Sequence, residues 1–238
     1  MTRTALAFSP HLDDAAFSAG ATLAGLARTG WRVVVATLFA GNVERPAGFA
    51  LECQTAKGIG PDTDYMALRR AEDVRACEAL GAEPVYLPLL EAPHRGYESP
   101  AALFGPVHGD DPARAQLGPA IRDLLDRLRP DLVLAPQAVG GHVDHVLVHA
   151  AVLASTARPA WLWRDWPYAR RRDAPEPFAT AMRALPVTSP DATDADHAAK
   201  RGASHAYASQ LGFQFGGPAA LDGALSESGA ERFAVLAR

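Results

Sequence analysis

Residues 4–14 read TALAFSPHLDD, an apolar run followed at once by a histidine and two adjacent aspartates. The run TALAFS (4–9) has the length and composition of a buried strand. The segment AAFSAGATLAGLARTG (15–30) has helical spacing and closes on a glycine. The segment WRVVVATLF (31–39) is continuous and β-branched, like a strand covered on both faces. This strand–helix–strand start predicts a parallel sheet flanked by helices.

The alternation of strand and helix continues along the rest of the chain. Further helices are expected over 67–82, 113–130, 144–157 and 195–213. Further strands are expected over 84–89, 131–136, 160–163 and, at the tail, 231–236. Long irregular loops are expected over 40–64, 90–112 and 165–195. The pattern predicts an α/β fold with a Rossmann-like doubly wound, mostly parallel sheet covered by helices on both faces, in a single domain over 1–238.

The composition excludes several classes of protein. The 238 residues carry a net charge of −4 and are 48% hydrophobic, so they can form a core but offer no basic face to nucleic acid or an anionic membrane. Cys53 and Cys77 lack C-x-x-C spacing, which is typical of a reducing compartment. No apolar stretch approaches the roughly 18 residues of a membrane span, and the first one ends too early for a signal peptide. We therefore expect a cytoplasmic protein without nucleic-acid or membrane partners.

Histidines and aspartates follow the first and the fourth expected strands. They are His11, Asp13, Asp14, His142, Asp144 and His145. Either group alone is equally well explained as a helix cap with charged residues in the first turn. In the doubly wound order, however, the two strands are neighbours at the crossover point, so both groups reach the same carboxyl edge of the sheet. Their coincidence favours a functional site over two unrelated caps.

The residue types in these two groups indicate a metal site. Imidazole and carboxylate suit Zn²⁺, and a catalytic zinc keeps three protein ligands. His142 and His145 are three residues apart and share one face of a helix start, so one can bind metal while the other reaches the substrate. Asp13 and Asp14 are adjacent and point differently, so one can be a ligand and the other a base. Fe²⁺ remains an alternative to zinc.

The two motifs together resemble a known family. SPHLDD (9–14) with GHVDH (141–145) looks like the PIG-L/LmbE-like zinc deacetylases, whose hallmarks are His-Pro/Leu-Asp-Asp after the first strand and His-x-Asp-His after the fourth. The resemblance covers almost the whole chain, because segments 69–97, 163–169 and 200–211 resemble further patterns of the family in the right order. It implies an LmbE-like α/β fold and hydrolysis of an N-acetyl group on a glucosamine-type sugar.

The resemblance also implies roles for the motif residues. His11, Asp14 and His145 would hold one zinc ion per chain. Asp13 would be the general base toward the attacking water. His142 would stabilise or protonate the tetrahedral intermediate. The products would be acetate and a free amine, and the partner a small acetylated amino sugar; a homo-oligomer remains open.

Further residues are assigned by the resemblance to support and to substrate binding. Asp144 would orient a histidine beside it. Arg69, Glu91, Arg95 and Tyr168 would bind the substrate. Asp165 lies near Tyr168 in an expected loop at the same edge. Substrate choice is expected to depend on the three long loops.

The chain departs from the family pattern at two positions. Ala15 stands where many members carry Glu, and Glu91 stands where Asp is common. These differences affect the expected recognition of the sugar more than the hydrolysis.

Alternatives to this reading are another metal-dependent amidohydrolase and three further classes. A metallo-β-lactamase-like hydrolase needs H-x-H-x-D-H, but Gly140 stands at its first position. A dinucleotide-binding protein needs G-x-G-x-x-G after the first strand, which is missing here. A non-catalytic carbohydrate-binding protein needs neither a base nor an acid, whereas this chain has both Asp13 and His142.

Overall fold

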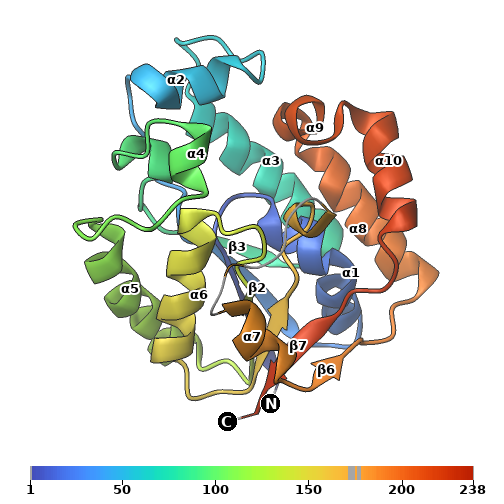
Figure 1. The fold of residues 1–238 in the computed structure, drawn as a ribbon. Coiled ribbons are helices and arrows are strands. Elements are labelled where there is room, and N and C mark those ends of the chain that lie inside the picture. Colours follow the sequence, from blue (N-terminus) through green and yellow to red (C-terminus); the bar gives the residue numbers. More distant parts are fainter. Residues whose placement is uncertain (1, 171–174, 176–177, 238) are drawn as a thin grey trace.

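The computed structural model describes residues 2–170, 175 and 178–237. A seven-stranded sheet crosses the molecule in the order β3-β2-β1-β4-β5-β7-β6 (Figure 1). The strands are β1 (Thr4–Ser9), β2 (Arg32–Thr37), β3 (Glu83–Tyr86), β4 (Leu132–Pro136), β5 (Ala160–Trp163), β6 (Val187–Thr188) and β7 (Phe233–Leu236). The first five are parallel in the doubly wound order, and β7 pairs antiparallel with both β5 and β6. The predicted fold class is confirmed.

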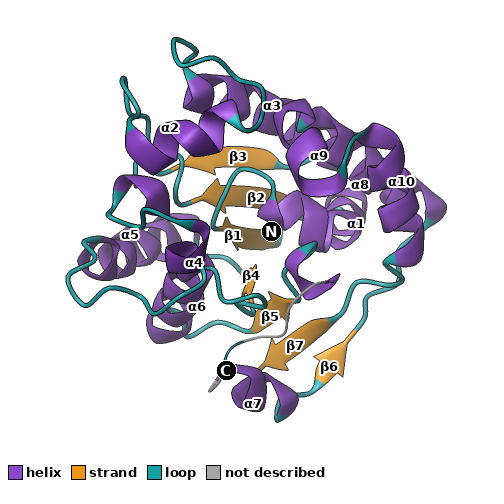
Figure 2. Cartoon of the chain, turned by 45° about the horizontal axis from the view of Figure 1, so that its top comes forward, coloured by secondary structure: helices purple, strands orange, loops and turns teal. Residues whose placement is uncertain are grey.

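Helices cover both faces of the sheet (Figure 2). On one face, α1, α3 and α8 pack against one another, and on the other face α5 packs against α6. The helices are α1 (Asp14–Arg28), α2 (Gly48–Thr55), α3 (Tyr65–Leu80), α4 (Pro100–Leu103), α5 (Ala113–Leu128), α6 (Val143–Ser155), α7 (Phe178–Arg183), α8 (Asp194–Ala206), α9 (Ala208–Phe215) and α10 (Pro218–Glu227). Within the described residues, no helix combines the length and hydropathy needed to cross a bilayer.

The apolar run of β1 explains why this strand lies at the centre. Ala5 and Ala7 face the core below α1, α3 and α8, while Leu6 and Phe8 face the core below α5 and α6. All four side chains are fully buried. Burial of a Leu or Phe side chain is worth about 1.5–3 kcal/mol, so alternate residues of one strand stabilise both layers.

The register of β1 and β4 brings the two sequence motifs together. The two strands are parallel neighbours, with Ala7 opposite Leu134. Their carboxyl ends therefore reach the same edge, where β1 leads into residues 10–13 and β4 into residues 137–142. The predicted meeting of the two motifs is confirmed.

The expected irregular loops were partly wrong. Segment 40–64 contains α2, and segment 90–112 contains α4 and the 3-10 turn Ala92–His94. Helices of four to eight residues are not stable in isolation and depend on tertiary packing. The sequence pattern therefore missed them. Segment 165–195 contains α7 and β6, while its residues 171–174 and 176–177 lie outside the described part.

The expected helix 195–213 was also wrong as a continuous element. It breaks at Tyr207, whose backbone leaves the helical region with φ −84° and ψ 53°, and continues as α9 in a new direction. Two carboxylates of α3 bind the residues at the break: Asp73 accepts the Tyr207 hydroxyl at 2.6 Å, and Glu72 accepts the backbone N–H and the hydroxyl of Ser209. Helix α10, which follows, was not predicted.

Candidate active site

The aspartates at the start of α1 do not cap the helix. Asp13 occupies the N-cap position, but its side chain makes no capping hydrogen bond. Instead, Ser9 Oγ accepts the N–H of Ala15 at 3.1 Å and donates to the carbonyl of His11 at 2.6 Å. Asp14 Oδ2 accepts the backbone N–H of His11 at 2.9 Å. The carboxylate of Asp13 is therefore available for other contacts.

The second motif is presented by a glycine turn. Gly140 has φ +91°, and a Cβ built on it would lie 2.8 Å from Cβ of Tyr168. Only glycine permits this close packing of Tyr168 over the turn. His142 then caps α6, since its Nδ1 accepts the N–H of Asp144 at 3.2 Å. We therefore assign the proton of neutral His142 to Nε2.

Three atoms that could bind a metal ion lie close together below the cavity. Asp14 Oδ2 lies 3.2 Å from His11 Nδ1 and 3.2 Å from His145 Nε2. Two ligands of a tetrahedral zinc with bonds near 2.0–2.1 Å lie roughly 3.3 Å apart, so this spacing fits the ion. His145 Nε2 is buried and has no hydrogen-bond partner among the described residues. A buried nitrogen without a partner is costly, and a metal ion would satisfy it.

Each histidine of this set is held by a carboxylate on its other nitrogen. His145 Nδ1 lies 2.6 Å from Asp165 Oδ1, and Asp165 Oδ2 accepts the N–H of Val139 at 2.8 Å. His11 Nε2 lies 2.9 Å from Asp144 Oδ2. Such carboxylates fix the tautomer and the orientation of metal-binding histidines. The Asp144 carboxylate thus faces His11, while its backbone N–H donates to His142.

A second set of residues, His11, His142 and Asp144, also lies close enough to hold an ion. This set fits less well because the carboxylate of Asp144 is already satisfied. Its Oδ1 accepts from Arg95 at 2.6 Å, and its Oδ2 accepts the N–H of Ala92 at 3.1 Å besides facing His11. The set with the unsatisfied His145 nitrogen is the better metal site.

Arg95, assigned to substrate binding by the resemblance, is placed behind the site. Its side chain is 3% exposed and is not part of the cavity lining. The guanidinium binds both oxygens of Asp111, at 2.9 and 3.0 Å, and Oδ1 of Asp144 at 2.6 Å. The structure therefore connects Asp111, Arg95, Asp144 and His11 in one buried chain.

Asp13 lies at the cavity beside two groups that position it. Its Oδ2 accepts from Gln214 Nε2 at 2.9 Å and lies 3.4 Å from Arg69 Nη2. Arg69 in turn donates to Glu91 Oε1 at 2.7 Å. Arg69, Glu91 and Asp13 all line the cavity, as does Tyr168. The residues that the sequence associates with substrate thus meet there, except Arg95.

The adjacent aspartates have opposite electrostatic environments. Burial raises the pKa of Asp13, and the charge of Asp14 adds to this effect against the opposing charge of Arg69. Burial also acts to raise the pKa of Asp14, but His145 and His11 outweigh it and hold that pKa well below its usual range. Carboxylates whose pKa values are separated in this way can serve as a charged ligand and as a base.

The pKa values of the two histidines of the second motif are also shifted in opposite directions. Burial lowers the pKa of His142 to about 3, aided by the nearby His11 and His145, so its ring is neutral. Burial also acts to lower the pKa of His145, but Asp14 and Asp165 outweigh burial and raise it to about 9. The surroundings of His145 therefore favour positive charge, as a cation site would require.

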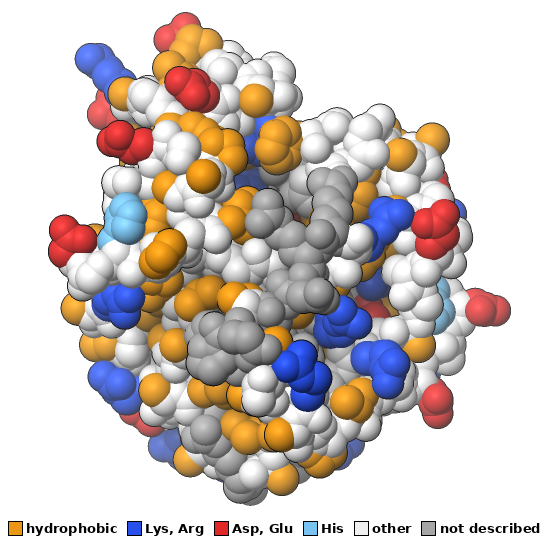
Figure 3. Space-filling model, viewed as in Figure 1, with side chains coloured by type: hydrophobic (Ala, Val, Ile, Leu, Met, Phe, Trp, Pro, Cys, Tyr) orange, Lys and Arg blue, Asp and Glu red, His pale blue; other side chains and the backbone are white. Residues whose placement is uncertain are grey.

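A cavity of about 730 Å³ opens above these groups. His11, Asp13 and His142 line it, and its walls come from α2, α4, α9 and the turn that carries Tyr168. Figure 3 shows a notch between the part of the surface that carries α2 and the part that carries α9 and α10. All three segments expected as long loops contribute residues to this wall.

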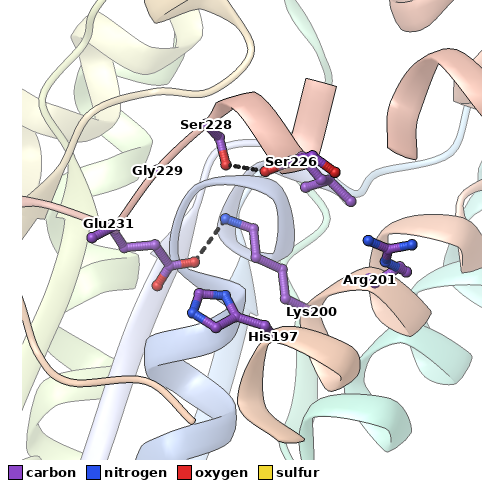
Figure 4. Close-up of a pocket in the computed structure, with 9 residues that line it drawn as sticks. His197, Lys200, Arg201, Ser226, Ser228, Gly229 and Glu231 are labelled. Atoms are coloured by element: carbon purple, nitrogen blue, oxygen red, sulfur yellow. Dashed lines mark hydrogen bonds and ion pairs between the residues drawn. The ribbon is translucent and has the colours of Figure 1, made fainter. Parts of the chain in front are cut away.

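A second, smaller cavity of about 370 Å³ lies between α8 and the segment after α10 (Figure 4). Its main feature is a buried ion pair in which Lys200 Nζ lies 2.8 Å from Glu231 Oε1. Glu231 also accepts the N–H groups of Ala21 and Thr22 at 3.0 and 2.8 Å. These bonds attach the segment before β7 to α1, so the ion pair has a structural explanation.

Sequence reasoning missed two residues that support the reactive groups of the site. Asp111 holds Arg95 from a loop 16 residues away, and Gln214 reaches Asp13 from a helix that was expected to end at 213. No local pattern indicates either contact. Asp165 was singled out because it follows a strand at the carboxyl edge, and it does lie against His145.

Comparison with known proteins gives the same family as the motifs. Residues 6–156 match the family model described as PIG-L: GlcNAc-PI de-N-acetylase. The chain is 36% identical over 173 residues to a 2'-N-acetylparomamine deacetylase of Streptomyces fradiae, covering 71% of this chain and 59% of that one. It is 31% identical over 163 residues to a 1D-myo-inositol 2-acetamido-2-deoxy-alpha-D-glucopyranoside deacetylase of Nakamurella multipartita, covering 66% and 55%. The match thus spans less than two thirds of either relative.

The fold is similar to that of solved deacetylases over nearly the whole chain. The zinc inhibited form of teicoplanin deacetylase Orf2 superposes with a TM-score of 0.81 and 27% sequence identity, covering 98% of both chains. Together with the parallel sheet, this similarity excludes the metallo-β-lactamase sandwich.

Proposed function

This chain belongs to the PIG-L family of GlcNAc-PI de-N-acetylases, and on that premise we propose that it is a metal-dependent N-deacetylase. It hydrolyses the acetamide of a glucosamine-type sugar conjugate and releases acetate. The observation that carries the proposal is the convergence of His11 Nδ1, Asp14 Oδ2 and His145 Nε2, a buried nitrogen that makes no hydrogen bond within the described part of the chain, beside a second carboxylate, Asp13. The names of the relatives, which deacetylate amino-sugar compounds, support the substrate class.

His11, Asp14 and His145 would hold the metal, for which we propose Zn²⁺, with Fe²⁺ as the alternative. When bound there, the ion would supply Lewis-acid polarisation of the acetamide carbonyl. Asp144 and Asp165 accept the remaining imidazole protons and present the ligating nitrogens to the ion. Teicoplanin deacetylase Orf2, which has the same fold, has a zinc inhibited form, so zinc binds to that relative.

Asp13 acts as the general base. Its raised pKa makes it the better proton acceptor of the two adjacent aspartates. Gln214 and Arg69 hold Oδ2, so Oδ1 is the oxygen that takes a proton from the attacking water. The same carboxyl group then returns this proton to the leaving amine, and the proton count balances.

His142 stabilises the tetrahedral intermediate as a neutral donor. Because Nδ1 accepts the N–H of Asp144, the Nε2–H group is free to donate to the developing oxyanion. The low pKa of His142 favours this role over full proton transfer. Arg69, Glu91 and Tyr168 line the cavity, which supports the proposal that they bind the sugar.

The test is acetate release from N-acetylglucosaminides by chelator-treated protein with and without added Zn²⁺. We expect zinc to restore release, and Asp13→Asn to lower it at least about a hundredfold while about one zinc per chain stays bound. Asp126→Asn, a carboxylate change on exposed α5 surface outside the cavity lining, is the matched control. Zinc binding without release from any substrate would instead favour a binding protein, and absence of zinc binding would reject the metal site.

A further inference from the structure

We propose that the outer part of the active-site cavity is a subsite for a bulky apolar aglycone, so that the substrate is an N-acetylated amino sugar linked to an aromatic or alkyl group. This inference rests on the proposed deacetylase function and specifies its substrate class. The subsite is formed by Phe49 on α2, Phe104 after α4 and Phe213 on α9, which we call the aromatic wall.

The cavity has two chemically different parts. Its inner part contains the polar groups His11, Asp13, Arg69, Glu91 and His142. Leu103 and the aromatic wall also line the cavity, and their side chains are half-buried or exposed, so we call this the outer part. Phe104 links the two parts, because its ring centroid lies 5.4 Å from that of His142. A sugar with its acetamide at the inner part therefore directs its other substituent toward apolar side chains.

The size of the cavity also exceeds the needs of a small acetamide. A volume of about 730 Å³ lies in the upper half of the range for sites that enclose ligands of several rings. The outer part therefore has room for a substituent beyond the sugar.

Phe213 is exposed in a way that indicates a partner. At 62% exposure, it is the most exposed large hydrophobic side chain in the described part of the chain. It stands at the cavity on α9, the helix that also sends Gln214 to Asp13. An apolar group that covers Phe213 would remove this surface from water, and burial of an aromatic side chain contributes strongly to binding.

The charges near the aromatic wall argue against a polycationic substrate. Lys57 Nζ lies 5.0 Å from the ring centre of Phe213 and 5.4 Å from that of Tyr65. Its ammonium also donates to the carbonyl of Cys53 at 2.7 Å, which holds the cation at this wall. Glu52 lines the same cavity, so a cationic aminocyclitol would meet Lys57 beside this carboxylate. An uncharged apolar aglycone meets no such obstacle.

The test compares kcat/KM for methyl, 4-nitrophenyl and octyl N-acetyl-β-D-glucosaminide with that for an N-acetylated aminocyclitol glycoside. We expect the 4-nitrophenyl and octyl compounds to exceed the methyl compound at least about tenfold, mainly through a lower KM. Phe213→Ala and Phe49→Ala should reduce the octyl-to-methyl ratio by about three- to tenfold. Val187→Ala, which truncates a 56% exposed residue of β6 outside the cavity lining, should leave the ratio unchanged.

Equal kcat/KM values for all β-glucosaminides, or a preference for the aminocyclitol glycoside, would overturn the inference while leaving the deacetylase proposal intact. If no compound releases acetate, the deacetylase proposal fails. In that event, calorimetric binding of 4-nitrophenyl N-acetyl-β-D-glucosaminide still tests the subsite. Weaker binding to Phe213→Ala than to Val187→Ala supports it, and equal binding rejects it.

Discussion

The inner and outer parts of the cavity are built by different means. The inner part stands on the ends of β1 and β4, and its histidines are held by Asp144 and Asp165. The outer part stands on α2 and α9, short helices whose side chains are partly exposed. The sheet therefore positions the reactive groups. The position of the outer wall depends instead on packing between peripheral helices.

The largest effect is expected from removing the central ligand of the inner part. Asp14→Ala deletes the oxygen that lies 3.2 Å from both histidine nitrogens, so zinc binding should be lost and acetate release should fall roughly a thousandfold or more. Metal analysis and a rate assay measure both results. Asp126→Ala, an exposed change on α5, should alter neither. Retention of zinc by Asp14→Ala would move the metal to the set that includes Asp144.

The next largest effect is a pH-dependent loss of stability at Asp73, which binds Tyr207 just before α9 in the outer part. Asp73 is buried below the start of α9, and burial raises its pKa to about 6, against the hydrogen bonds from Tyr207 and Tyr86. Because this pKa exceeds the unfolded value of about 4, the folded state binds the proton more tightly. The stability contributed by Asp73 is thus present below pH 4 and is lost as the pH rises to about 6, by about 3 kcal/mol.

Urea unfolding of chelator-treated protein between pH 4 and pH 7 measures this contribution. The difference in unfolding free energy between the native chain and Asp73→Asn should shift in favour of Asp73→Asn as the pH rises, since asparagine does not titrate. Asp64→Asn, at the exposed N-cap of α3, serves as a control for a general carboxylate effect. A difference that does not change with pH would show that Asp73 titrates normally.

A smaller effect is expected where a carboxylate supports the inner part from behind. Asp165→Asn keeps the shape but weakens the acceptor that faces His145 Nδ1 at 2.6 Å. The zinc dissociation constant, measured by competition with a chelator, should rise about 10- to 100-fold. An unchanged constant would mean that Val139 and the local packing alone orient His145.

The smallest effect is expected one contact further from the metal. Arg95→Lys loses the paired contact with Asp111 while keeping a cation near Asp144. We expect zinc affinity to fall by up to about tenfold, less than for Asp165→Asn, because Arg95 acts on His11 only through Asp144. Arg32→Lys, in the exposed pair with Glu83, is the matched control. A loss larger than that of Asp165→Asn would reverse the ranking of the two supports.

Much of the sheet could be predicted because its signal is local. The continuous apolar runs of β1, β2 and β4 identify strands buried on both faces, and the glycines at 30 and 81 mark helix ends. The direction of the last strand could not be predicted, because its antiparallel pairing with β5 depends on where α10 returns the chain. Helices α2 and α4 were missed because they are too short to be stable without their neighbours.

The sequence by itself determined the α/β class and the two groups of histidines and aspartates at one edge of the sheet, because strand periodicity and motif spacing are properties of neighbouring residues. Tertiary structure decided the rest. Only the fold shows that Arg95 lies behind Asp144, that Gln214 reaches Asp13, and that Phe213 borders the cavity. These contacts join residues 49 to 201 positions apart, or depend on a helix break at which two buried carboxylates bind. No local pattern encodes them.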